Sequence, residues 1–181
     1  DHSPVLVSWV AVVNDPYERD RATREYRLVQ DRPIPGPTLS LLYDEESPYA
    51  GRIDDVVLFS RNTSIESKEH DALTETLDAL RNHDPGIDIT VEQLDGEDPT
   101  DHRGLFEFLR QRMPKVRQRF PGRELIIHIS PGTPSMQTIW VLMGETGFIE
   151  PPMQLVKSYR KAERRGRPAV VPVSLGIDTF Y

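Results

Sequence analysis

The chain has 181 residues, a length typical of one domain with a substantial buried core. Its net charge of −7 argues against a surface built for polymeric DNA or RNA, so any phosphate ligand requires a local site. The absence of cysteines removes disulfides, thiol nucleophiles and the common zinc clusters, and no apolar run approaches the roughly 20 residues that span a bilayer. With no signal-peptide pattern either, we expect a cytoplasmic protein.

The first half of the chain alternates apolar stretches with polar turns. Residues 5–13 are nearly all apolar, which predicts a strand buried on both faces that ends at the turn Asn14-Asp15-Pro16. Residues 17–37 are polar and charged, and predict a long loop or flap that can include a little helix or hairpin. The elements expected next are a short helix at 38–43, a strand at 55–60, a helix from a Thr63–Glu66 capping box to about Asn82, and a strand at 87–94.

The second half continues this alternation of helices and strands. Thr100 suits the N-cap of a helix that reaches Phe120, and Pro114 should kink or split that helix. A strand at 125–129, a turn and a helix follow, and then strands at 153–160 and 169–175, the last of which holds Pro172 and suits a sheet edge. We therefore expect a single α/β domain over residues 1–181, with a Rossmann-like, mostly parallel sheet of about six strands and helices on both faces.

The strand at 125–129 leads into its helix through a turn rich in hydroxyl groups and glycine. Thr133 or Ser135 suits the N-cap, and Pro134 suits the first helical turn. Backbone N–H groups at a helix N-terminus form a natural phosphate site, and Gly132 lets a ligand approach the backbone. Side-chain donors expected at this turn are Ser130, Thr133, Ser135 and Gln137. The turn matches neither a Walker A loop nor GxGxxG, so an ordinary capped turn stays an equal alternative.

Two further polar turns follow predicted strands of the same sheet. Asn14 and Asp15 come after the first strand, and Arg61 and Asn62 come after the strand at 55–60. Because the carboxyl ends of parallel strands share one edge, these turns should converge with the turn at 130–135. Arg61 is suited to bidentate contact with a phosphate. Each residue alone is better explained by a turn or by solvation, whereas the set together favours a binding site.

The remaining chemistry-bearing residues do not form a catalytic pattern. No pair of histidines has metal-ligand spacing, there is no serine-hydrolase elbow, and no carboxylates form a readable pair. His128 lies within a predicted strand and is expected to be a hydrogen-bonded core residue, and Trp9 and Trp140 are expected in the core. The basic segment from Lys157 to Arg167 is interpreted as a solvated loop, although it could help to bind an anion. No catalytic residue, metal or cofactor is therefore predicted.

These features give the chain a resemblance to the CARF family, the Rossmann-like sensor domains associated with CRISPR systems. More narrowly, it resembles the branch found at the N-terminus of the RNA-repair activator RtcR. The resemblance runs over nearly the whole chain and is carried by residues 36–42, by residues 125–133, and by Gln137 and Trp140 in the following helix. The strand, Gly-Thr turn and helix form its most specific part.

The resemblance implies a homodimeric sensor that binds a cyclic oligoadenylate of four or six nucleotides across the paired turns. Such a domain would be the N-terminal part of a larger protein and would allosterically control a fused effector in type III CRISPR antiviral defence, without a membrane or polymeric DNA as partner. The ligand contacts that it implies are Ser130, Gly132, Thr133, Ser135, Met136 and Gln137. It implies contacts less strongly at Asn14, Asp15, Arg61 and Asn62.

Two other functions stay open at this point. One is the ligand-sensing domain of an RtcR-like transcriptional activator, which responds to an RNA-end signal. The other is a metal-independent ring nuclease that cleaves the cyclic ligand, with Ser130, Thr133 and Arg61 as candidate transition-state contacts.

Overall fold

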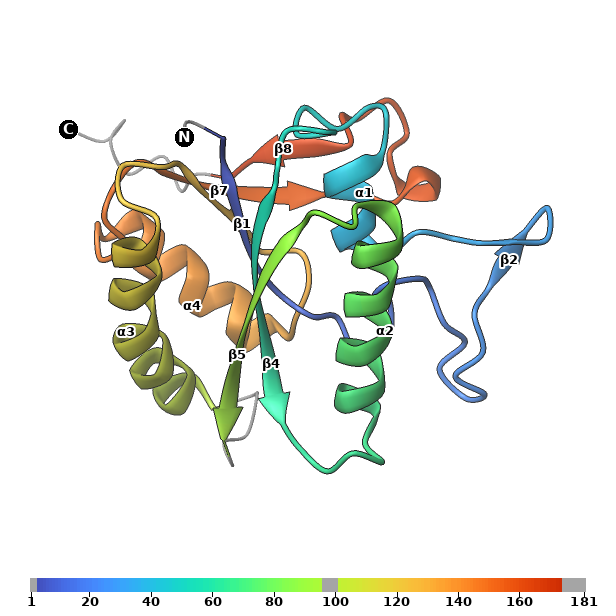
Figure 1. Ribbon diagram of the computed structural model, residues 1–181, viewed down its shortest axis with the longest axis horizontal. Coiled ribbons are helices and arrows are strands. Elements are labelled where there is room, and N and C mark those ends of the chain that lie inside the picture. Colours follow the sequence, from blue (N-terminus) through green and yellow to red (C-terminus); the bar gives the residue numbers. More distant parts are fainter. Residues whose placement is uncertain (1–2, 96–100, 174–181) are drawn as a thin grey trace.

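A computed structural model describes residues 3–95 and 101–173 of the chain. The main sheet consists of β1 (Val5–Trp9), β4 (Asp55–Asn62), β5 (Asp88–Asp95), β6 (Leu125–His128), β7 (Met153–Ser158) and β8 (Val170–Pro172). Its helices are α1 (Pro37–Tyr43), α2 (Lys68–His83), α3 (His102–Arg119) and α4 (Pro134–Glu145), with a short 3-10 turn η1 (Lys161–Glu163). Helices α1 and α2 cover one face of the sheet and α3 and α4 the other, which confirms the predicted α/β fold (Figure 1).

The six strands lie in the order β5-β4-β1-β6-β7-β8, so β1 occupies the interior of the sheet. The pairings from β5 to β7 are parallel, and only β8 runs antiparallel to its neighbour β7. Val7 lies opposite Val57 of β4 and Ile127 of β6. All residues of β1 are buried, as expected for an interior parallel strand that is covered on both faces. Pro172 lies on the edge strand, as its missing N–H predicts.

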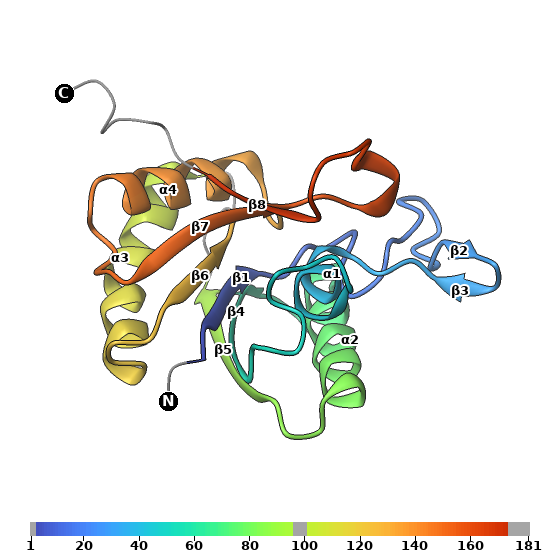
Figure 2. The ribbon, with the colours of Figure 1, turned by 90° about the horizontal axis from the view of Figure 1, so that it is seen from above.

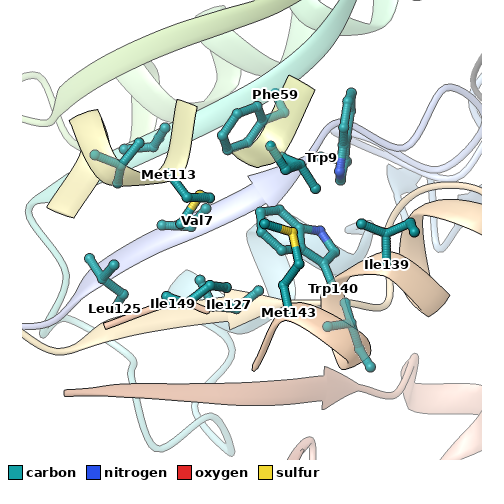
Figure 3. Close-up of a cluster of buried hydrophobic side chains, with 14 of the residues drawn as sticks. Val7, Trp9, Phe59, Met113, Leu125, Ile127, Ile139, Trp140, Met143 and Ile149 are labelled. Carbon is teal, nitrogen blue, oxygen red and sulfur yellow. The ribbon is translucent and has the colours of Figure 1, made fainter. Parts of the chain in front are cut away.

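Alternate residues of each strand enter two separate cores. Trp9 and Phe59 pack against Trp140 of α4 in the core shown in Figure 3, with ring centroids 5.5 Å apart for Trp9–Phe59 and 5.8 Å apart for Phe59–Trp140. Leu6 and Leu58 point to the opposite face and pack with side chains of α1 and α2. Each fully buried side chain of this size contributes roughly 1.5–3 kcal/mol to stability. The two tryptophans are core residues, as predicted.

The first strand is shorter than the sequence predicts. It ends at Trp9, and residues 10–13 leave the sheet although they are apolar. The carboxylate of Asp15 accepts the backbone N–H of Ala11 at 2.7 Å, while the N–H of Asp15 donates to the Ala11 carbonyl at 2.9 Å. These reciprocal hydrogen bonds curl the chain into a loop and stop the strand.

Two helix starts also differ from expectation. Helix α2 begins at the N-cap Ser67, whose hydroxyl accepts the N–H of His70 at 3.0 Å, so the predicted capping box at Thr63 is wrong. The Thr63 hydroxyl instead contacts that of Ser67. Helix α3 is capped by Asp101, and the expected cap Thr100 lies outside the described residues. Pro114 does not split α3, which runs unbroken from His102 to Arg119.

The polar segment after the first strand forms an arm, the flap (residues 17–36), that projects from the sheet. It contains a small antiparallel hairpin of β2 (Leu28–Val29) and β3 (Arg32–Pro33), which lies away from the core in both views (Figures 1 and 2). The flap returns to the domain at Gly36, where a Cβ atom would lie 1.6 Å from the Asn14 carbonyl oxygen. Only glycine therefore fits where the flap rejoins the sheet beside Asn14.

Candidate functional site

The carboxyl ends of β1, β4 and β6 surround a cavity, the carboxyl-edge hollow, of about 410 Å³. Its walls also include the first turn of α4 and part of the flap. The residues predicted from the sequence that line it are Asn14, Arg61, Ser130, Gly132, Thr133 and Met136. The predicted residues that do not line it are Asp15, Asn62, Ser135 and Gln137. The structure thus brings together members of all three predicted turns.

Gly132 makes the turn between β6 and α4 possible. Its φ angle is +102°, a conformation that side-chain-bearing residues rarely adopt. A Cβ atom there would lie 2.8 Å from the Met136 sulfur and 3.5 Å from the Trp9 Cβ. The missing side chain therefore lets the turn pack against both the helix and the end of β1.

Thr133 caps helix α4, as predicted, and Pro134 occupies the first turn. The Thr133 hydroxyl accepts the N–H of Met136 at 3.3 Å, and the Thr133 N–H donates to the Met136 sulfur at 3.3 Å. The sequence suggests that the first N–H groups of the helix are available to an anion, but the N–H of Met136 is already bound by this cap. The helix dipole still places partial positive charge at the hollow.

Two of the predicted polar contacts hold the turn itself. The Ser130 hydroxyl donates to the Ser158 carbonyl at 3.2 Å and accepts the Ser158 N–H at 2.8 Å, which joins the turn to β7. The Gln137 side chain donates to the Ser130 carbonyl at 3.3 Å. Gln137 therefore stabilises the turn without lining the hollow, whereas Ser130 both stabilises the turn and lines the hollow.

Arg61 brings a positive charge to the hollow from the end of β4. Its side chain is 34% exposed, and its Nη1 lies 3.9 Å from the Glu69 carboxylate of α2. The Arg61 Nε is buried and has no hydrogen-bond partner within the described ranges. The same holds for the indole N–H of Trp9, which also lines the hollow. Two residues that line the hollow thus each carry a buried donor without an acceptor in the described ranges, which costs free energy.

Asp15 and Asn62 make structural contacts instead of facing the hollow. The buried Asp15 carboxylate accepts hydrogen bonds from Ala11 and Thr38, and its burial raises the pKa to about 6 although these bonds oppose the rise. The Asn62 amide donates to the Asp95 carboxylate at 2.5 Å across the β4–β5 pair. Asp15 therefore organises the loop that carries Asn14 and does not itself reach the hollow.

His128 is a core residue, as predicted. It is fully buried in β6, with its Nε2 2.7 Å from the Ser158 hydroxyl and its Nδ1 3.5 Å from the Ser8 hydroxyl. Burial lowers the pKa of the imidazole to about 3, so the ring is neutral at physiological pH. It does not line the hollow and has no role in proton transfer there.

Sequence reasoning missed several residues of the hollow. Residues 10–13 line it because they leave the sheet, and Glu69 reaches it from the first turn of α2. Arg21 reaches it from the flap. The concentration of arginines directly after the first strand was a usable signal for Arg21, whereas nothing in the local sequence marks Glu69.

Two classes of site are not found in the described part of the chain. No group of metal-ligating side chains is arranged to hold an ion there. No helix in residues 3–95 and 101–173 has the length and apolar character needed to cross a membrane.

Comparison with known proteins shows a similarity in fold. No family model and no curated protein sequence matches the chain. Among solved structures, it is similar to Enterococcus italicus Csm6 bound to cyclic hexa-2′-fluoro-hexa-dAMP, with a TM-score of 0.69 and 15% sequence identity. The similarity covers 97% of this chain and 43% of the Csm6 chain, so this chain spans less than half the length of that protein. Since Csm6 contains a CARF domain, the chain has a CARF-like variant of the Rossmann-like fold.

Proposed function

We propose that this chain is a cytoplasmic sensor domain that binds a cyclic oligoadenylate of four or six nucleotides in the carboxyl-edge hollow. Two copies would share one ring, and the bound ring would allosterically control a fused effector in type III CRISPR antiviral defence. The observation that carries this proposal is the convergence of three strand ends and the Arg61 guanidinium on one hollow. The fold shared with Csm6, which was solved with a cyclic hexanucleotide analogue, supports it.

The chemistry of the hollow suits a phosphate-linked nucleotide. The Arg61 guanidinium, on a side chain that is 34% exposed, can bind a phosphate oxygen, and its contact of 3.9 Å with Glu69 is long enough to yield to a stronger partner. Trp9, Val10 and Met136 supply apolar wall against which an adenine face can lie. The site therefore combines a charge for the backbone with an apolar surface for the base.

The size of the hollow supports a shared ligand. Its volume of about 410 Å³ is near the lower end of the roughly 300–1,000 Å³ range for pockets that bury a single drug-sized ligand. A ring of four or six nucleotides is several times larger than such a ligand. Two hollows facing each other across a two-fold axis would enclose opposite halves of one ring.

Calorimetric titration with cyclic tetra-adenylate and cyclic hexa-adenylate tests the proposal. We expect one ring to bind per two chains. Arg61→Gln should weaken that binding about tenfold to hundredfold, because a hydrogen bond to a charged group contributes about 1.5–3 kcal/mol. The matched control is Arg81→Gln, which removes an exposed arginine in the last turn of α2, at the far end of the helix from Glu69. The control should bind like the unmodified chain.

The result that overturns the proposal is a failure of the unmodified chain to bind either ring. Binding of an RNA with a terminal phosphate, without binding of a ring, would instead indicate an RtcR-like sensor of RNA ends. Mass spectrometry of the recovered ring distinguishes sensor from ring nuclease, since the nuclease leaves a linear product.

A further inference from the structure

A second, smaller cavity adjoins the carboxyl-edge hollow on the side of the flap. This cavity, the flap pocket, has a volume of about 220 Å³. Apart from Val13, its lining residues are polar or charged: Asn14, Glu18, Arg19, Arg21, Arg27 and Arg160. Val13, Asn14 and Arg21 also line the hollow, so the two cavities share a wall. A ligand that fills the hollow can therefore extend a group into the flap pocket.

The charges of the flap pocket do not balance. Four guanidinium groups line it against one carboxylate, that of Glu18. Glu18 is paired with Arg160 at 3.0 Å, and Arg19 is paired with Glu75 at 2.9 Å. Arg21 and Arg27 make no ion pair within residues 3–95 and 101–173. A chain of net charge −7 thus places an excess of positive charge in the lining of this pocket, although the Asp20 carboxylate interacts electrostatically with Arg27.

Arg19 of the pocket lining and the nearby Arg24 are both hydrogen-bonded to the loop after β1. The Arg19 side chain, 2% exposed, donates to the carbonyls of Val12 and Asp15. Arg24 donates to the same Val12 carbonyl at 3.0 Å, and its Nη2 is buried with no hydrogen-bond partner among the described residues. Burial, and then the nearby charge of Arg19, lower the pKa of Arg24, which means that its charge is held at a cost. The carboxylates of Glu75, Asp71 and Glu69 offset part of that cost, and an anion bound nearby would offset more of it.

We infer that the flap pocket is an anion-binding subsite that takes a phosphate group. Guanidinium groups bind phosphate oxygens in bidentate geometry, and Arg21 and Arg27 are exposed side chains of one short segment that both line the pocket. The volume equals roughly seven water molecules at about 30 Å³ each, which is enough for a phosphate and a few waters. That the phosphate belongs to the oligonucleotide in the hollow rests on the proposed function, whereas phosphate binding by the pocket does not.

The first test uses inorganic pyrophosphate and so does not depend on the identity of the oligonucleotide. Titration of the isotope-labelled chain should give saturable NMR shifts in the side-chain Nε–H signals of Arg21 and Arg27 and in the backbone N–H signals of Glu18 and Arg160, which also line the pocket. The shifts of Glu18 and Arg160 should disappear in the double variant Arg21→Gln, Arg27→Gln. They should persist in Arg32→Gln, which removes an exposed arginine of the same flap that does not line the pocket. Absence of saturable shifts in the unmodified chain would overturn the inference.

The second test measures the affinity for cyclic tetra- and hexa-adenylate at several salt concentrations. The double variant should bind about tenfold more weakly. Its affinity should also depend less on salt, because fewer arginines neutralise the ligand phosphates and fewer counterions are released on binding. Unchanged affinity together with a loss in Arg61→Gln would refute the contribution of the flap pocket and leave the hollow as the ligand site. If the unmodified chain binds no ring, the proposed function fails and the pyrophosphate titration alone decides whether the pocket binds anions.

Discussion

The carboxylate of Asp15 accepts hydrogen bonds from both the backbone N–H and the hydroxyl of Thr38, at 3.2 and 3.0 Å. The same carboxylate accepts the N–H of Ala11 at 2.7 Å. One buried side chain therefore joins the loop after β1 to the first turn of α1, across the base of the flap. The positions of Asn14 and of the loop at residues 10–13, both parts of the hollow, depend on it.

Asp15→Asn should destabilise the chain by about 1–3 kcal/mol at neutral pH, because an amide nitrogen cannot accept the hydrogen bonds that a carboxylate oxygen accepts. The variant also removes the titratable carboxyl group of Asp15. Since burial raises the pKa of Asp15 to about 6, the folded chain holds this proton more tightly than the unfolded chain. The contribution of Asp15 to the unfolding free energy therefore has a pH-dependent part in addition to its hydrogen bonds. This part should increase as the pH falls from 6 towards 4, and be lost as the pH rises through 6.

Urea unfolding at a series of pH values measures this contribution as the difference between the unmodified chain and Asp15→Asn. The difference should grow by about 2 kcal/mol from pH 6 to pH 4, which is most of the roughly 3 kcal/mol expected for the whole pKa shift at about 1.4 kcal/mol per unit. Gln118→Ala, on the exposed side of α3, changes no titratable group and provides a control whose difference should stay constant. A difference that is independent of pH would contradict the assigned role of Asp15.

His128 should show the opposite pH dependence. Its pKa is lowered to about 3 by burial, so the unfolded chain binds the proton more tightly. The unmodified chain should lose stability as the pH falls below about 6.5, by about 2 kcal/mol at pH 5, relative to His128→Gln, which does not titrate. NMR of the imidazole ring gives a second measurement, in which the His128 signals should not titrate between pH 8 and 5. A titration of the His128 signals within this pH range would show that the ring is not held neutral.

The sequence was informative where one local signal determines the structure. The apolar stretch that became β4 and the Thr133-Pro134 start of α4 both follow from residues next to each other in the chain. The edge position of β8 follows from Pro172 alone. For the same reason the convergence of Asn14, Arg61 and Thr133 was predictable, because parallel topology brings strand ends together without knowledge of side-chain packing.

The errors arose where distant residues compete with the local signal. Residues 10–13 are apolar enough for a strand, but the Asp15 carboxylate binds Ala11 and Thr38, and Thr38 is 23 residues away in the chain. Thr63 and Ser67 are both good caps, and the choice of Ser67 depends on where β4 ends. The arginines of the flap could be seen in the sequence, whereas their position against Asn14 required the folded chain.

Gly132→Ala tests the turn between β6 and α4 directly. The new Cβ would lie 2.8 Å from the Met136 sulfur and 3.3 Å from the Met136 Cβ, in a backbone conformation with φ +102°. Backbone strain and crowding together should cost about 2–4 kcal/mol, and the displaced Met136 side chain should weaken ring binding because it lines the hollow.

The control is Gly122→Ala, where φ is +72° but no atom lies within 4 Å of the new Cβ. This variant should cost about 1 kcal/mol through strain alone and bind the ring normally. Urea unfolding and ring titration of both variants measure the two effects, and equal stability losses would mean that the contact with Met136 does not constrain residue 132.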